Sequence, residues 1–140
     1  MERHSLDVVQ LPASIADQRL LTDGTVDRLA QAGIEIHVRS LYLQGLLLAE
    51  PAFVAARFPA HAAWAQRFHD ECRNLGLHPL AACLSFFRAR PGFRVAVTGA
   101  ASSAEVAGLL AAWQQVVPVD WSGWAVDNPG FTDPRSWKTI

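Results

Sequence analysis

The sequence has little net charge, few cysteines and no long apolar run, and each shortage excludes a class of protein. Lysine and arginine number 12 against 13 acidic residues, so the formal net charge of −1 provides no basic surface for nucleic acid or an anionic membrane. No stretch reaches the roughly 18 apolar residues of a membrane-spanning helix. The N-terminus MERHSLDVV does not have the form of a signal peptide, which predicts a cytoplasmic protein.

The two cysteines and five histidines do not form a metal-binding pattern. Cys72 and Cys83 have no CxxC or Cys/His spacing, and each falls on the apolar face of an expected helix. We therefore predict two small buried hydrophobic side chains and no metal site.

Apolar residues are abundant, at 51% of the 140 positions, which is enough for a sizeable core. Charged residues make up 18%, below the usual ~25%, a composition typical of chains that bury surface against a partner. The length suits one domain but is short of the roughly 250 residues of a complete (β/α)8 barrel. No repeat or linker divides the chain, so residues 1–140 are expected to form a single domain.

Strand and helix patterns alternate along the chain. A β-branched run at 6–12, a clean alternation at 34–42 and a third run at 92–99 predict strands. Helices are expected around 26–30, after Pro51, over 60–75, from Pro79 and from Ser102. Strands separated by helices favour right-handed βαβ units and a parallel sheet.

Ligands of parallel α/β folds bind at the carboxyl ends of the strands, and all three strand ends are polar here. The third end leads into Ser102 and Glu105, which have the S-x-x-E spacing of a capping box. The same helix start also suits a phosphate, so a structural cap and a phosphate site are both open interpretations.

One face of the second expected strand carries Glu35, His37 and Arg39, opposite Ile34, Ile36 and Val38. Such a group is either a catalytic trio or a set of polar side chains paired with each other and with further strands. The second interpretation makes this face a candidate contact between chains.

Several longer motifs carry a family resemblance. The segments VVQLPASIAD, GIEIHVRSLYLQGLLL and LGLHPLAACLSFFRARPGFRVAVTGAASSAEV resemble strands six to eight of an aldo/keto reductase, in particular the bacterial branch with an HVRS-x-x-LQGLLL signature. The tail DNPGFTDPRSW is similar to the same branch. The resemblance covers nearly the entire chain and implies half of a (β/α)8 TIM barrel, with three parallel strands and flanking helices.

The resemblance also implies a site for NADP or NAD. Gln10 matches the residue that contacts the nicotinamide carboxamide. The loop after the second strand, 40–46, matches the part that wraps the pyrophosphate, and the turn after the third strand, 99–105, matches the adenosine site. Two positions depart from residues that are common in the family. Ser14 replaces the asparagine after the first strand, and Arg39 replaces an aromatic residue that stacks on the nicotinamide. The implied contacts are Gln10, Ser14, Arg39, Ser40, Gln44, Gly45, Leu46, Gly99, Ser102, Ser103 and Glu105.

Two further departures concern specificity and chemistry. Ser102 and Leu109 replace the basic residue and the asparagine that hold the adenosine phosphate in the family, so a preference for NADP over NAD does not follow. The family's catalytic Asp, Tyr, Lys and His lie on the first four strands, before the part that this chain resembles. The only tyrosine and lysine here, Tyr42 and Lys138, are not placed to replace them, so the chain alone is expected to be inactive.

Three functional hypotheses follow. The chain is the NAD(P)H-binding half of an aldo/keto reductase-like protein, a non-catalytic oligomerisation module, or a fragment of an active NADPH-dependent carbonyl reductase. The open strand edges of half a barrel predict either a homodimer or a complementing N-terminal half, and neither nucleic acid nor a membrane as a partner.

Overall fold

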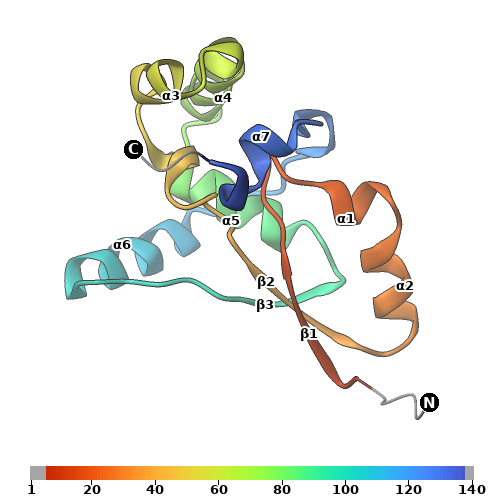
Figure 1. Cartoon of the computed structure of the whole chain (residues 1–140). Coiled ribbons are helices and arrows are strands. Elements are labelled where there is room, and N and C mark those ends of the chain that lie inside the picture. Colours follow the sequence, from red (N-terminus) through yellow and green to blue (C-terminus); the bar gives the residue numbers. More distant parts are fainter. Residues whose placement is uncertain (1–5, 138–140) are drawn as a thin grey trace.

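The computed structural model describes residues 6–137, and a parallel sheet lies at its centre (Figure 1). Its strands are β1 (Val8–Pro12), β2 (Glu35–Arg39) and β3 (Phe93–Ala96), in the order β1-β2-β3. β1 and β2 pair in continuous register, whereas Arg94 interrupts the pairing of β2 with β3. The expected mixed α/β fold, with three parallel strands and flanking helices, is confirmed.

Helices fill the connections between strands and the segment after β3. Between β1 and β2 lie α1 (Arg19–Thr22) and α2 (Thr25–Gln31). Between β2 and β3 lie α3 (Pro51–Arg57), α4 (Ala62–Asn74) and α5 (Pro79–Arg88), with short 3-10 turns at Leu46–Leu48 and Pro59–His61. After β3 come α6 (Ser103–Gln114), α7 (Pro129–Thr132) and 3-10 turns at Ser122–Trp124 and Pro134–Ser136.

Helix boundaries follow the local signals in the sequence. Gly33 and Gly76 adopt φ values of 74° and 66° after α2 and α4, in the left-handed region that favours glycine. Pro79 begins α5, where the missing proline N–H costs no hydrogen bond. His78 caps the same helix, because its Nδ1 accepts the N–H of Leu80 at 3.2 Å.

The alternation along β2 determines which face of the sheet is buried. Ile36 and Val38 are fully buried and join one core cluster with Phe86 of α5 and Phe93 of β3. Burying a side chain of this size contributes about 1.5–3 kcal/mol to folding. Cys83 of α5 belongs to the same core, and burial raises the pKa of its thiol.

The other face of the sheet is uncovered in residues 6–137. Val8 and Val95, the register neighbours of Glu35 and His37, are 48% and 39% exposed. Gln10 lies in the same row and is exposed as well. Parallel sheets are normally covered on both faces. This sheet therefore has one packed face and one open face.

Helix α6 also has an open surface and projects from the rest of the molecule (Figure 1). Its only buried residue is Ala112, whereas Val106, Leu110 and Trp113 are 47%, 63% and 38% exposed. Helix α6 packs on α5, and the ring of Trp113 lies under the Arg88 guanidinium, 5.2 Å from its centroid.

The C-terminal segment, residues 121–137, packs tightly on α4 and its neighbours. Trp121 and Phe131 are 1% and 0% exposed, and the Trp64 indole N–H of α4 donates to the carbonyl of Trp124 at 3.1 Å. This segment is a packed extension that contains only short helical turns. No helix of residues 6–137 combines the length and apolar character needed to cross a lipid bilayer.

Candidate functional site

A cavity of about 360 Å³ opens at the carboxyl ends of β1 and β2. Four segments line it: the end of β1, the start of α1, the loop after β2 and the C-terminal segment. Ligands of parallel α/β sheets bind at this edge, so we take this cavity as the candidate functional site. Its lining residues are Pro12, Asp17, Arg19, Arg39, Ser40, Leu43, Gln44, Thr132, Asp133, Pro134 and Arg135.

The loop after β2 has an unusual backbone. Ser40, Leu43 and Gln44 have φ values of 63°, 48° and 55°, and Gly45 follows at 83°. A non-glycine residue in the left-handed region costs roughly 1–2 kcal/mol, so this loop stores strain unless packing compensates for it.

Leucine side chains compensate for that strain. Leu41, Leu43, Leu46 and Leu47 are each at most 4% exposed and join the main core. The N–H of Leu43 also donates to the carbonyl of Ser40 at 2.9 Å. The leucines thus hold the loop from inside, while its polar side chains remain at the cavity.

Two ion pairs form the opposite wall. Asp17, 5% exposed, accepts two hydrogen bonds from the Arg19 guanidinium, at 2.8 and 2.9 Å. Asp133 pairs with Arg135 in the same way, with a shortest distance of 2.6 Å. The hydrogen bonds from the Arg135 guanidinium hold the pKa of Asp133 at about 2.

Arg39 is the one arginine of this cavity that has no carboxylate partner within residues 6–137. Its guanidinium donates only to the Ser40 hydroxyl, at 3.3 Å. Three arginines against two aspartates leave the cavity one net positive charge. An unpaired guanidinium beside a serine and a glutamine suits an anionic ligand.

The structure gathers some of the implied cofactor residues and separates others. Arg39, Ser40 and Gln44 line the cavity, while Gly45 and Leu46 line an adjacent one of about 430 Å³ that shares Gln44. Asp17, Arg19, Asp133 and Arg135 were not among the residues implied by the resemblance. Their only local signal is a repeated Asp-x-Arg spacing.

Gln10 and Ser14 lie outside the cavity. Gln10 is exposed in the middle of β1, on the open face of the sheet. Ser14 is fully buried, and its hydroxyl accepts the N–H of Asp17 at 3.0 Å. In this structure Ser14 shapes the turn that carries Asp17 to the cavity wall.

The implied adenosine contacts lie at the start of α6, away from the cavity lining. Ser102 accepts the N–H of Glu105 at 3.2 Å, and Glu105 accepts the N–H of Ala101 at 2.6 Å. The two side chains form a variant of the capping box that the spacing predicted, in which Glu105 accepts the amide before the N-cap instead of the N-cap amide itself. Gly99 precedes these residues, Ser103 lies between them, and both are exposed.

The three polar residues of β2 do not act as one group. His37 Nε2 lies 2.7 Å from Glu35 Oε1 on the open face of the sheet. Arg39 bonds to Ser40 instead. The interpretation as structural pairing holds for Glu35 and His37, and Arg39 belongs to the cavity.

Tyr42 does not line the cavity. Its hydroxyl is buried without a hydrogen-bond partner in residues 6–137, and burial raises its pKa to about 12. Within the same residues, no three His, Cys, Asp or Glu side chains are grouped to hold a metal ion.

Comparison with known proteins adds no assignment: the sequence matches no protein family model, and no curated protein matches it significantly.

Proposed function

We propose that the cavity at the carboxyl ends of β1 and β2 binds the pyrophosphate part of NADH or NADPH, as in the C-terminal half of an aldo/keto reductase barrel. The observation that carries this proposal is the unpaired Arg39 guanidinium beside Ser40 and Gln44. The resemblance implies pyrophosphate contacts for Ser40 and Gln44 and places Arg39 beside the nicotinamide. We assign Arg39 to the pyrophosphate because a guanidinium pairs with phosphate oxygens.

The residues present fit a pyrophosphate better than a neutral ligand. Arg39 offers several N–H donors in a planar fork, and phosphate oxygens accept two of them at once. Ser40 and Gln44 add a hydroxyl and an amide from a loop that the buried leucines fix in place. A preorganised loop reduces the entropy lost on binding.

When bound, the nicotinamide group supplies a hydride. The residues of this cavity bind and orient the cofactor, but no described side chain lining it is suited to donate a proton, and Tyr42 is not among the lining residues. We therefore propose that residues 1–140 alone do not reduce a carbonyl. The capping box occupies Ser102 and Glu105, so we expect NADH and NADPH to bind alike.

Calorimetric titration with each dinucleotide tests the proposal. Arg39→Gln removes a charge-assisted contact of about 1.5–3 kcal/mol, which corresponds to a tenfold or larger rise in Kd. Arg94→Gln is the matched control, because Arg94 is exposed and does not line the cavity. Absence of heat at millimolar NADH and NADPH, or equal affinity of both variants, would exclude dinucleotide binding here.

The open face of the sheet favours a second function, assembly into a closed barrel. Gln10, Glu35 and His37 make this face too polar for an ordinary helix layer, whereas strands of a second half would cover it and pair the free edges of β1 and β3. The partner is a second copy or an N-terminal half-barrel. A sedimentation mass of about 15 kDa with one sharp unfolding transition would rule out the homodimer.

A further inference from the structure

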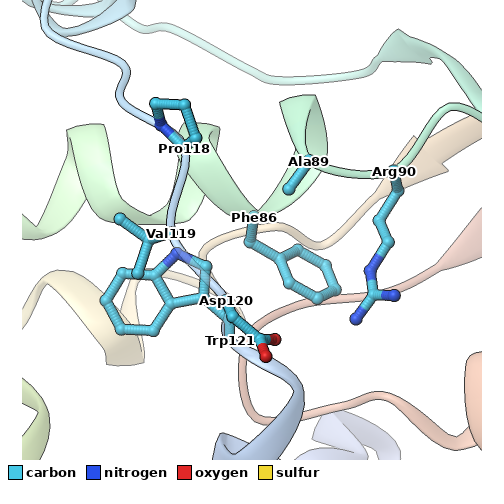
Figure 2. A pocket seen from close by; sticks show the side chains of 7 residues that line it. All are labelled: Phe86, Ala89, Arg90, Pro118, Val119, Asp120 and Trp121. Carbon is cyan, nitrogen blue, oxygen red and sulfur yellow. The ribbon is translucent and has the colours of Figure 1, made fainter.

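A second cavity, of about 440 Å³, lies between the end of α5 and the chain that leads into the Ser122–Trp124 turn (Figure 2). Arg90 on its wall precedes β3, so this cavity lies at the amino end of that strand. It shares no lining residue with the proposed dinucleotide cavity. Its volume falls in the roughly 300–1,000 Å³ range of small-molecule sites.

Two opposite charges project toward the same opening of this cavity. Figure 2 shows the Arg90 guanidinium and the Asp120 carboxylate on either side of the Phe86 ring. No ion pair joins them within residues 6–137; the guanidinium lies 5.9 Å from the centroid of Phe86. The pKa of Asp120 lies below its usual range because its carboxylate accepts hydrogen bonds from Ser122 and faces the positive charge of Arg90.

The remaining wall is apolar and contains an unpaired donor. Phe86 and Trp121 are each 1% exposed, and Ala89 and Pro118 complete the apolar surface. The indole N–H of Trp121 has no acceptor within residues 6–137. That N–H is itself buried and points toward the Val119 side in Figure 2, so it does not face the opening between Arg90 and Asp120.

We propose that this cavity binds a free α-amino acid with an apolar side chain. Its carboxylate pairs with Arg90, its ammonium group pairs with Asp120, and its side chain contacts the exposed apolar surface of Ala89 and Pro118. A zwitterion satisfies both charges and brings no net charge into the site. A simple anion or cation leaves one of the two side chains facing a like charge.

Titration of the isotope-labelled chain with phenylalanine, followed by NMR, tests this assignment. The amide signals of Ala89 and Asp120 should shift and saturate at roughly millimolar ligand. N-acetylphenylalanine lacks the ammonium charge and phenylalaninamide lacks the carboxylate, so each should bind at least about tenfold more weakly. No shift at about 10 mM phenylalanine, or equal binding of the three ligands, would overturn the proposal.

Matched variants locate the two contacts. Arg90→Gln should bind phenylalanine and phenylalaninamide equally weakly, and Asp120→Asn should do the same for phenylalanine and N-acetylphenylalanine. The controls Arg94→Gln and Asp127→Asn replace exposed side chains outside the cavity and should change nothing. Arg90→Gln should leave the NADH titration unchanged, so the outcome is independent of the proposed dinucleotide site.

Discussion

The two faces of β2 differ strongly in how far their side chains are buried. On one face Ile36 and Val38 are fully buried in a core that continues into the aromatic rings of α4 and the C-terminal segment. On the other face Glu35 is exposed and Val8 beside it is 48% exposed. Successive side chains of one strand thus face either the core or solvent. The packed face therefore provides the folding stability, and a partner chain would bind on the open face.

The polar residues on the open face of the sheet limit the kinds of structure that could cover it. Doubly wound sheets are apolar on both faces because helices pack on each. Here Gln10, Glu35 and His37 alternate with valines, a mixture suited to the interior of a closed barrel, where polar layers pair across strands. The contrast supports the half-barrel proposal over a helix-covered open sheet.

Removing a ring from the packed side should give the largest effect. Phe68 is 1% exposed, and its ring lies 5.5 Å from Trp64 and 6.0 Å from Trp121. Phe68→Ala should lower the free energy of unfolding by about 3–5 kcal/mol, because the cavity it leaves cannot close fully. Urea unfolding measures this loss.

Phe53→Ala is the matched control for Phe68→Ala. Phe53 is 56% exposed on α3, so the same truncation should cost less than about 0.5 kcal/mol. Similar losses in the two variants would show that the aromatic core does not carry the stability assigned to it.

The ion pair at the cavity wall should make stability depend on pH. The pKa of Asp133 is about 2 in the folded protein, against an ordinary value of 3.8, because the Arg135 guanidinium donates to its carboxylate. The stabilisation is therefore complete above pH 4 and is lost as pH falls from about 4 to 2, where the unfolded chain takes up the proton first.

Asp133→Asn measures that dependence. The amide oxygen still caps the turn at Arg135, but the charge is gone, so the variant should be less stable than the parent at pH 5 and equal to it near pH 2. Asp127→Asn, at an exposed aspartate outside any ion pair of residues 6–137, should follow the parent at every pH. A constant gap between the parent and Asp133→Asn would show that the pair adds no pH dependence.

Sequence patterns predicted those elements that short-range features of the chain determine. The alternation from Ile34 to Arg39 predicted β2 and both of its faces, and the S-x-x-E spacing predicted the capping box at Ser102. The strand was expected to reach Tyr42, but the chain turns at Ser40. Nothing local predicts left-handed backbone at Ser40, Leu43 and Gln44, because the loop leucines that compensate for it pack into a core built by residues far along the chain.

The cavity wall opposite Arg39 was also beyond local patterns. Its residues Asp17 and Asp133 are brought together by contacts of long sequence range, among them the Gln18 side chain, which donates to the carbonyl of Trp121 at 2.7 Å. The residues implied by the resemblance divide accordingly. Arg39, Ser40 and Gln44 meet at the cavity and Gly45 and Leu46 line the adjacent one, whereas Gln10 and the start of α6 lie apart from both.

The smallest expected effect lies on the open side. Leu110 is 63% exposed on α6, so Leu110→Gln should change the free energy of unfolding of the monomer by no more than about 0.5 kcal/mol. Ala112→Gln, two residues along, should cost about 1–3 kcal/mol because Ala112 is buried in a cluster with Leu84.

Unfolding and sedimentation at several protein concentrations test whether the exposed surface of α6 binds a second copy of the chain or remains open to solvent. If this surface docks on a second copy, Leu110→Gln lowers the mass of the assembly at a given concentration and leaves the monomer as stable as before. If both quantities are unchanged, the partner lies on the open face of β2 and not on α6. A loss of more than about 1 kcal/mol in the free energy of unfolding of the monomer would mean that Leu110 packs within the chain. In that case only the sheet, and not α6, would have an open surface.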